Sequence, residues 1–411
     1  MIGYPARFAI LVGLAASLLL CPAPCAWAGP GAAFLDPTAF TSLGVFNPET
    51  NVVVDVDSGQ MSGGASFTGV NVTQAGFPLW VFTFSSFTLN SGLTVTITND
   101  GPDSPGVAFL SQRDMTIAGA IHADGEVGSA ALYGNGAGAG SNGETNTLGG
   151  DGGGGGGYGG MGGPGDGGTT GGGTYNTDLS AQLAGGSGGG TGGASLGGPG
   201  GLGGGALQIA ALGSLTLSGT ISADGGAGAM GQLSINTPGG SGGGGSGGGL
   251  LVQAGKLTVN SNAVLSAIGG DGGPSYVLPL GHFNFAGGGG GGGGGRIVVA
   301  FPGAGITGGS FAVSGGSSGY GFSGDGAPGT VNFVQSSLVP AIPSIAASPG
   351  TSGNIVISWP SYATNYALQT SAALGGGAVW NTVTGAVVVG NNFVLTNQAL
   401  GVAGFFRLTL Q

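Results

Sequence analysis

The sequence predicts an all-β protein: a short parallel β-helix (a solenoid) with glycine-rich insertions on one edge, followed by a small C-terminal antiparallel β-sandwich. Three observations lead to this prediction. An apolar phrase at residues 115–126 returns at residues 215–226 with the same spacing. Tracts of glycine follow the same point of the phrase in successive copies. Beyond residue 353 the chain changes to short alternating runs rich in aromatic residues, which are typical of strands.

Residues 1–28 have the pattern of a secretory signal peptide. Arg7 precedes an apolar run at residues 8–20, and a small-x-small motif predicts cleavage after Ala28. The apolar run is shorter than the about 20 residues of a membrane-spanning helix. We therefore expect a secreted or cell-surface protein whose mature chain has no transmembrane helix. It would also have no disulfide, because both cysteines lie inside the signal.

Residues 29–79 carry no clear copy of the phrase and are predicted to form an N-terminal cap, since a solenoid needs its open end covered. Within this region residues 51–64 predict a strand followed by a turn. Asp55, Asp57 and Gly59 resemble the start of a calcium loop but lack the downstream ligands of an EF-hand. We therefore predict no cofactor and no metal site, with structural calcium here or at the Asp-Gly-Gly corners as the alternative.

Residues 80–336 are predicted to form the β-helical repeat domain. In the clearest copy, residues 205–226, three short β-type runs follow one another. Each copy is too small to bury its own apolar face, so the copies must stack. Equivalent residues would then lie about 4.8 Å apart in inward columns. Two such columns are Ile121, Ile221 and Leu265, and Ala123, Ala223 and Ala267.

The glycine-rich insertions are residues 125–204, 225–248 and 269–295. Because each follows the same corner of the repeat, all three should leave the solenoid on one side. Ordering a glycine costs roughly 0.5–1 kcal/mol more than ordering an alanine. The tracts therefore either stay mobile or pack as bundled extended helices of the polyproline II type, joined by backbone hydrogen bonds. We expect partial order.

Residues 337–353 are predicted to be a linker, and residues 354–411 a compact β-sandwich module. The module has five strand candidates, and its aromatic side chains would supply a core. These side chains are Trp359, Tyr366, Trp380, Phe393 and Phe406.

The motifs "FSSFTL", "LTVTI" and "DMTIAGAIHADG" (residues 84–125), followed by glycine-rich blocks, are similar to glycine-rich β-helical exoproteins of environmental bacteria. The ending, with "ISWP", "YALQTS" and "FFRLTL", resembles a C-terminal module of secreted proteins of Verrucomicrobia-like bacteria and is similar to fibronectin type III. The resemblance covers most of residues 50–411. It implies an architecture, and it brings no family active site with it.

The composition excludes some classes of function. The chain has 411 residues, of which 103 are Gly and 20 are Pro, yet 40% are hydrophobic and 5% charged, which is not the composition of a disordered chain. Removing Arg7 with the signal changes the formal charge from −11 to −12. Nucleic acid is not an expected partner, because phosphate binding needs clustered basic residues. The remaining basic residues are Arg113, Lys256, Arg296 and Arg407.

No catalytic set emerges from the sequence. His122 is expected to face solvent on a strand, and His282 has no companion at metal-ligand spacing. A glycoside hydrolase needs paired carboxylates, for which Asp114 and Asp124 are the candidates, with Arg113 nearby. Asp124 and Asp224 each precede a corner glycine, where aspartate stabilises turns, so a structural role is the stronger interpretation.

These observations favour an exported, non-enzymatic surface or matrix scaffold that is adhesin-like and displays glycine-rich loops. Its partners would be polysaccharide or cell-surface components. One alternative is a β-helical enzyme that degrades polysaccharide. A second is a protein that binds ice or another crystal surface, for which Thr116, Thr216 and Thr258 would have to form an exposed flat ladder.

Overall fold

The computed structural model describes an all-β chain, which confirms the predicted class; η1 (Pro37–Ala39) is a single short 3-10 turn. The predicted signal peptide at residues 1–28 and His282 lie outside the described residues. The described residues are 35–74, 76–98, 104–126, 137–146, 149–179, 181–234, 237–277, 285–302, 306, 308–319, 321–335, 343, 345–350, 354–361, 363, 366–373, 378–390, 392–398 and 404–410.

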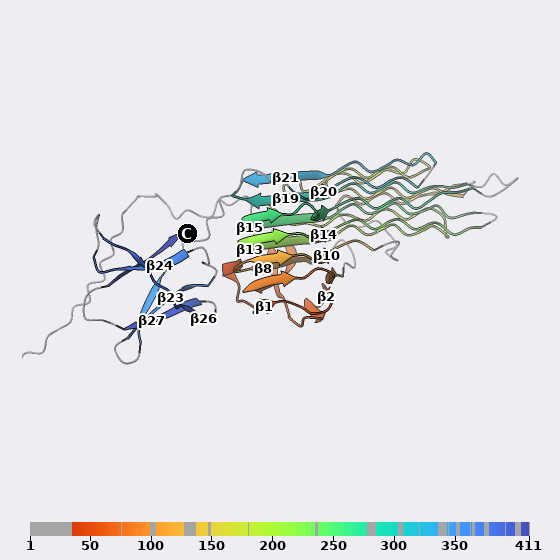
Figure 1. Ribbon diagram of the computed structural model, residues 1–411. Coiled ribbons are helices and arrows are strands. Elements are labelled where there is room, and N and C mark those ends of the chain that lie inside the picture. The colour runs from red at the N-terminus through yellow and green to blue at the C-terminus, as the bar shows by residue number, and fades with distance from the viewer. Residues whose placement is uncertain are drawn as a thin grey trace, which may run out of the picture.

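The centre of the molecule is a stack of parallel strands in three ladders (Figure 1). The first ladder runs β5 (Phe77–Phe84), β8 (Gly106–Ser111), β13 (Ala206–Leu217), β15 (Gly249–Val259), β19 (Arg296–Phe301) and β21 (Thr330–Gln335). The second runs β1 (Val45–Phe46), β6 (Ser86–Leu89), β9 (Met115–Ile117) and the second halves of β13 and β15. The third runs β2 (Val52–Asp55), β7 (Thr94–Ile97), β10 (Ala120–His122), β14 (Thr220–Ser222), β16 (Val264–Ser266) and β20 (Ser310–Ala312).

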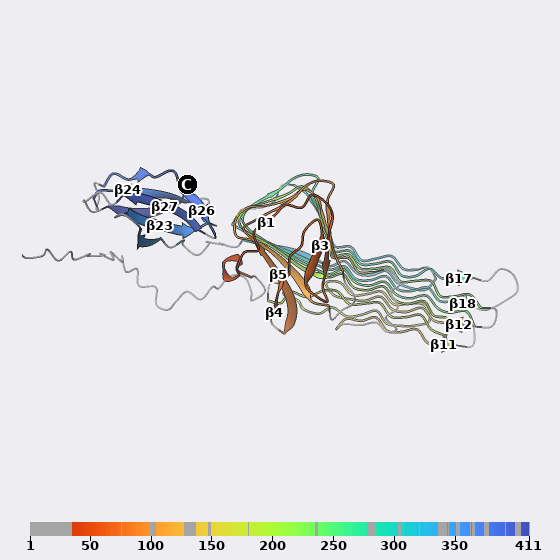
Figure 2. The same ribbon diagram turned by 90° about the horizontal axis from the view of Figure 1, so that it is seen from below.

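The register within the ladders agrees with the alignment of the repeated phrases. Ile121 pairs with Ile221, which pairs with Leu265. All three side chains are buried in one apolar cluster, together with Ala123, Ala223 and Ala267. Figure 2 looks along the stack and shows the strands around a three-sided cross-section, which the side chains of this cluster fill. The spacing of the phrase therefore specified which residues face inward.

The cap region contributes more to the stack than its sequence indicated. β1 and β2 pair in parallel with β6 and β7, although residues 29–79 show no clear repeat. The stack ends on antiparallel hairpins, because β3 (Gln60–Gly63) pairs with β2 and β4 (Val70–Gln74) pairs with β5. Hairpins of this kind cover strand edges that would otherwise be open to pairing with another chain.

The outer face of the first ladder is buried as well. Leu110, Leu251 and Val298 alternate with the inward residues and form a second apolar cluster. The first insertion covers them with Leu179 and Leu183, and the cap adds further apolar side chains. The long first insertion is therefore part of the packed structure over this face.

The glycine tracts all connect the third ladder to the first, so they leave the stack at one corner (Figures 1 and 2). A fourth tract at residues 313–329, between β20 and β21, does the same, although the sequence pattern did not single it out. Two short hairpins lie at the far end of the tracts. Their strands are β11 (Thr145–Asn146) with β12 (Gly149–Gly150), and β17 (Tyr276–Val277) with β18 (Phe285–Ala286).

The described tracts pack side by side as extended chains, which we call the glycine bundle. The hydrogen bonds of residues 240–248 have a period of three residues, as three residues per turn of a polyproline II helix require. The N–H groups of residues 240, 243 and 246 donate to carbonyl groups of residues 187–193. Those of residues 241, 244 and 247 donate to carbonyl groups of residues 287–293. Those of residues 242, 245 and 248 donate to carbonyl groups of residues 223–229. The carbonyl groups of the same segment accept hydrogen bonds from N–H groups of three further segments of the insertions, residues 198–204, 153–156 and 270–273.

Close backbone contact explains why the bundle is built of glycine. A Cβ atom at Gly240, Gly243 or Gly292 would lie closer than 3.0 Å to a carbonyl oxygen of a neighbouring tract. The extra entropic cost of about 0.5–1 kcal/mol per glycine is of the same size as the net gain of about 0.5–1.5 kcal/mol per hydrogen bond. The bundle therefore depends on nearly every interior N–H group having a partner.

A buried arginine joins the bundle to the stack. Arg296 begins β19 and is only 6% exposed. Its Nη2 donates to the carbonyl oxygens of Tyr158 at 3.3 Å and Tyr175 at 3.2 Å, and its Nη1 donates to Thr330 Oγ1 at 3.1 Å. The guanidinium also lies 5.5 Å from the centre of the Tyr158 ring. One side chain thus fixes two points of the first insertion against the first ladder.

The C-terminal unit consists of two antiparallel sheets around a separate apolar cluster that contains Trp359 and Leu368. One sheet has β22 (Ala346–Pro349), β23 (Asn354–Pro360), β27 (Asn392–Gln398) and β26 (Val387–Val389). The other has β25 (Asn381–Thr382), β24 (Tyr366–Ser371) and β28 (Phe405–Leu410).

Two expectations for the C-terminal part differ from the structure. β22 lies inside the segment 337–353 that was expected to be a linker, because its backbone completes the edge of the sheet beside β23. Trp380 lies outside the apolar cluster, and the Arg407 guanidinium sits 4.2 Å from the centre of its ring.

Candidate functional site

The corner where the glycine tracts leave the stack gathers His122, Asp124 and Asp224, three of the residues that the sequence analysis considered for chemistry. Asp124 Oδ1 accepts the backbone N–H of Asp224 at 2.8 Å, and Asp224 Oδ1 accepts that of Ile268 at 2.8 Å. Ser222 Oγ donates to Asp124 Oδ2 at 2.9 Å, and Ser266 Oγ donates to Asp224 Oδ1 at 2.6 Å. Each carboxylate thus caps an N–H group of the next copy of the repeat.

The pKa of Asp224 is raised above its ordinary value, and burial is the largest cause. Hydrogen bonds from Ser266 and Ile268 oppose the shift, and the neighbouring charge of Asp124 adds to it. The two carboxyl groups are therefore close enough to interact. Both oxygens of Asp124 and Oδ1 of Asp224 nevertheless accept hydrogen bonds from backbone and serine groups, as in a turn cap.

His122, Ser222 and Asp124 lie together but not as a nucleophilic triad. His122 Nδ1 is 2.7 Å from Ser222 Oγ and 3.3 Å from Asp124 Oδ2. In a catalytic triad the serine and the carboxylate occupy opposite nitrogens of the ring, so that a proton can pass from one side while the other orients the imidazole. Here both contact the same nitrogen. The arrangement favours the structural role of Asp124 and Asp224.

Asp114 and Asp124, the pair considered for glycoside hydrolysis, are at different corners. Asp114 precedes β9 in the second ladder, whereas Asp124 follows β10 in the third. Asp114 Oδ1 accepts the backbone N–H of Ser214 at 2.7 Å, again one copy further along. Arg113 turns to the C-terminal unit, where its Nε donates to the Ser361 carbonyl at 2.8 Å. The structure does not bring these residues together as an acid–base set.

The calcium-like segment is the tight turn between β2 and β3. Asp55 Oδ1 accepts the N–H of Asp57 at 2.9 Å, and its Oδ2 accepts the hydroxyl of Ser58 at 2.7 Å. These hydrogen bonds lower the pKa of Asp55. Gly59 has a φ of +66° and lies against the Trp80 indole, so a side chain would not fit there. Both oxygens of Asp55 therefore serve the turn.

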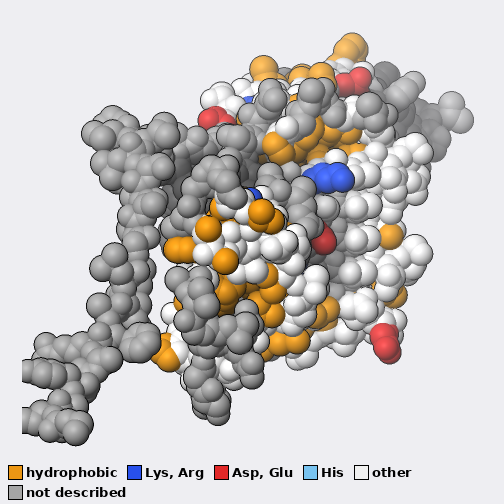
Figure 3. Space-filling view, turned by 60° about the vertical axis from the view of Figure 1, so that its left-hand side comes forward, with side chains coloured by type: hydrophobic (Ala, Val, Ile, Leu, Met, Phe, Trp, Pro, Cys, Tyr) orange, Lys and Arg blue, Asp and Glu red, His pale blue; other side chains and the backbone are white. Residues whose placement is uncertain are grey.

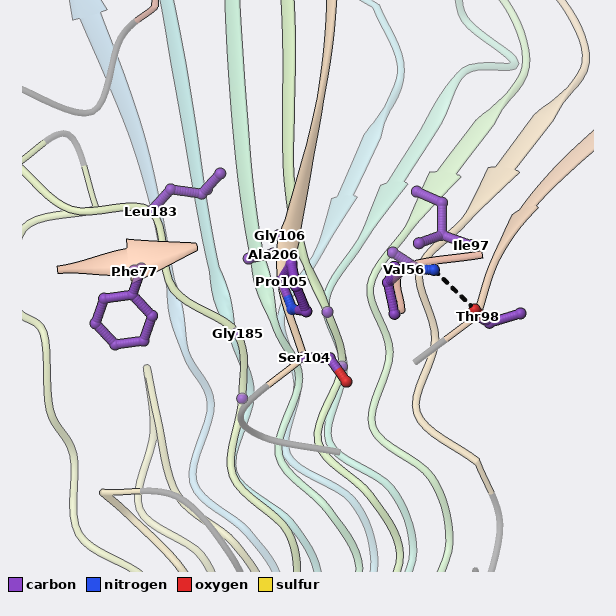
Figure 4. Close-up of a pocket in the computed structure, with 14 residues that line it drawn as sticks. Val56, Phe77, Ile97, Thr98, Ser104, Pro105, Gly106, Leu183, Gly185 and Ala206 are labelled. Atoms are coloured by element: carbon purple, nitrogen blue, oxygen red, sulfur yellow. Dashed lines mark hydrogen bonds between the residues drawn. The ribbon is translucent and has the colours of Figure 1, made fainter. Parts of the chain in front are cut away.

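A small cavity of about 30 Å³ lies where the cap meets the base of the bundle (Figure 4). Its walls include Val56, Phe77 and Ile97, and Thr98 Oγ1 accepts the N–H of Val56 at 3.2 Å. The volume suits about one water molecule. None of its lining side chains is ionisable, so the cavity offers no group for acid–base chemistry.

A larger cavity, of about 220 Å³, lies beside the β11–β12 hairpin at the far end of the bundle. Sequence reasoning missed it, although the polar and aromatic residues that interrupt the tracts mark the place. Phe322 lies at its edge and is 91% exposed. The complete lining is Asn146, Gly150, Asp151, Asp166, Gly167, Gly287 and Phe322.

The two carboxylates of this cavity, Asp151 and Asp166, are held by hydrogen bonds to their side chains and to their backbones. Asn146 Nδ2 donates to Asp151 Oδ1 at 2.5 Å, and the N–H of Gly167 donates to Asp166 Oδ1 at 2.9 Å. The backbones of Asp151 and Asp166 also belong to the bundle, through hydrogen bonds with Glu144 and with residue 288. Burial is the largest cause of the raised pKa of Asp151. The hydrogen bond from Asn146 opposes the shift, and the charges of Asp166 and Glu144 add smaller upward effects.

Comparison with known proteins leaves the geometry as the basis for function. No family model, curated protein or solved structure matches the chain. Within the described ranges, no cluster of three or more His, Cys, Asp or Glu side chains has an arrangement that could hold a metal ion. The same part of the chain contains no helix long and apolar enough to cross a membrane.

Proposed function

We propose that the stack is a short parallel β-helix and that the C-terminal unit is a β-sandwich module for attachment, sorting or spacing. We further propose that the protein is an exported, non-catalytic scaffold of the cell surface or matrix with an adhesin-like role. Export would depend on residues 1–28 as a signal peptide. The partners would be polysaccharide or other cell-surface components.

The glycine bundle is the observation that carries this proposal. Tracts cross-linked by hydrogen bonds in several directions form a stiff extension, whereas isolated glycine chains would be flexible linkers. In Figures 1 and 2 the bundle extends from the stack on the side away from the C-terminal sheets. Such a shape suits a protein that holds its outer loops at a distance from an attachment point.

The sparse charge of the surface fits contact with uncharged partners. On the face in Figure 3, acidic and basic side chains are few and lie apart from one another. A charge share of 5% over the whole chain gives little electrostatic steering toward ionic ligands. Hydroxyl-rich polymers interact mainly through hydrogen bonds and ring contacts, which do not depend on such steering.

The test is binding of the purified full chain to surfaces coated with polysaccharide or with bacterial cells, together with an assay for released reducing ends. We expect retention on at least one coated surface without cleavage. Cleavage that disappears in the Asp124→Asn variant would replace this proposal with the glycan-degrading alternative. A chain retained on no coated surface would not be an adhesin.

Binding to ice or another crystal surface is a second candidate, supported by one specific relationship. Thr116 pairs with Thr216, Thr216 with Thr258, and Thr88 joins the same column through Thr116. Thr258 is exposed, whereas Thr116 and Thr216 are half-buried, so the column offers only a small area to a crystal surface. Thermal hysteresis that is abolished by Thr216→Lys would favour this candidate, and its absence in the wild type would remove it.

A further inference from the structure

We propose that the cavity at the far end of the glycine bundle, beside the β11–β12 hairpin, is a saccharide subsite for a non-acidic polysaccharide. This inference rests on the adhesive function proposed above and assigns that function to a place. The cavity measures about 220 Å³, which is below the about 300–1,000 Å³ of pockets that enclose drug-sized ligands. It therefore suits one sugar ring of a longer chain.

The polar groups of the cavity select a ligand that donates hydrogen bonds. Asp151 and Asp166 each use Oδ1 for a bond within the site, and no described residue donates to either Oδ2. An ionised carboxylate only accepts hydrogen bonds. Two acceptors beside one cavity match neighbouring hydroxyl groups of a sugar, and they repel a uronate, sulfate or phosphate group.

Phe322 supplies the apolar contact. Its ring is 91% exposed at the edge of the cavity, where folding gains almost nothing from burying it. The C–H face of a sugar ring packs well on such a surface, and a polymer that crosses the end of the bundle would cover it. Isolated exposed aromatic residues are common, so the argument depends on this ring standing beside the two carboxylates.

The site is also rigid. Gly167 and Gly321 both have a φ of +91°, and the side chains of Asp151 and Asp166 occupy the space where their Cβ atoms would lie. Both carboxylates are therefore fixed by the bundle before any ligand arrives. A preformed site loses less entropy on binding than a mobile loop does.

The experiment is affinity electrophoresis of the full chain in gels containing dextran, mannan, xylan or the acidic polymer polygalacturonate. We expect retardation by at least one of the three neutral polymers and none by polygalacturonate. Phe322→Ala should weaken that retardation about tenfold, and Asp166→Asn should weaken it as well. The control is Phe333→Ala, which removes a ring that is 52% exposed on β21 in the stack, away from the cavity, and should leave the retardation unchanged.

Each outcome decides something. If the wild type is retarded and Phe322→Ala is retarded equally, the tip assignment is wrong while the adhesive function stands. If no polymer retards the wild type, and surfaces coated with polysaccharide or cells also fail to retain it, the proposed function fails too. Titration with butylammonium chloride tests for a cation site; saturable binding that Asp166→Asn abolishes would overturn the saccharide assignment. Melting temperatures of Phe322→Ala and Asp166→Asn should match the wild type, because these side chains lie at the surface of the bundle end. Phe333→Ala removes an edge contact with Phe311 and is expected to melt lower with its retardation unchanged.

Discussion

Asp124 Oδ1 lies 2.8 Å from the backbone nitrogen of Asp224, one hundred residues further along the chain. The same relationship joins Asp114 to Ser214 and Asp271 to Ser317, each time with the carboxylate accepting the N–H group. Aspartate thus supplies acceptors where no neighbouring backbone does so. This accounts for aspartates at the corners of a chain that carries little charge.

The raised pKa of Asp224 predicts a pH dependence of stability. The folded state holds the proton of Asp224 more tightly than the unfolded state, whose pKa is near 3.8. This group therefore lowers the free energy of unfolding as the pH rises from about 4 through the raised value. Asp224→Asn keeps an oxygen that accepts from Ser266 and Ile268, and it removes the titration.

We expect the stability difference between wild type and Asp224→Asn to move in favour of the variant as the pH rises. The measurement is urea unfolding of both proteins at several pH values between 4 and 7. Asp124 and His122 are the titratable neighbours, and they are present in both proteins. If the free energies of unfolding of the two proteins changed equally with pH, titration of Asp224 would not be the cause of the pH dependence.

Gly243→Ala tests the contact between tracts. Its Cβ would clash with the carbonyl oxygen of Gly154 in the interior of the bundle, so the tracts must separate locally. We expect a loss of about 1–3 kcal/mol in the free energy of unfolding, the usual cost of overpacking. Gly173→Ala is the matched control, because no atom lies within 4 Å of its added Cβ. Equal stabilities of the two variants would argue against close packing.

Arg296→Met tests the joint between bundle and stack. The change leaves the carbonyl oxygen of Tyr175 without its donor, at a cost of about 1–3 kcal/mol if that group stays buried, while the carbonyl of Tyr158 keeps only the N–H of Tyr175. We expect lower stability and faster hydrogen exchange at residues 158–175. Lys256→Met, at an exposed position of β15, is the control. Unchanged exchange in this segment would show that apolar packing alone holds the insertion.

Arg113→Ala tests the contact between the stack and the C-terminal unit. The guanidinium donates to the Ser361 carbonyl and lies 4.9 Å from the centre of the Phe393 ring. A hydrogen bond and a cation–π contact together stabilise such an interface by about 1–2 kcal/mol. We expect a larger radius of gyration by X-ray scattering with little change in melting temperature. Arg407→Ala, which alters a contact inside the unit, should leave the radius unchanged.

The sequence by itself determined the register of the stack. The one-hundred-residue spacing of Ile121 and Ile221 placed them in one column, because a one-residue slip would turn every apolar side chain of a strand to the wrong face. It also located the corner of the insertions and five of the seven strands of the C-terminal unit, but not β22 or β26. These features follow from local alternation, which is visible in the residues themselves.

Only the tertiary structure decided which tracts touch. A run of glycine carries no side-chain pattern. Nothing in residues 240–248 therefore predicts the six chain segments with which they exchange hydrogen bonds. The same holds for the far end, where Asp151 and Asp166 of the first insertion meet Phe322 of the fourth tract through the packing of the backbone. Side-chain periodicity specifies a strand, whereas a glycine bundle is specified by complementary backbone groups distant in the chain.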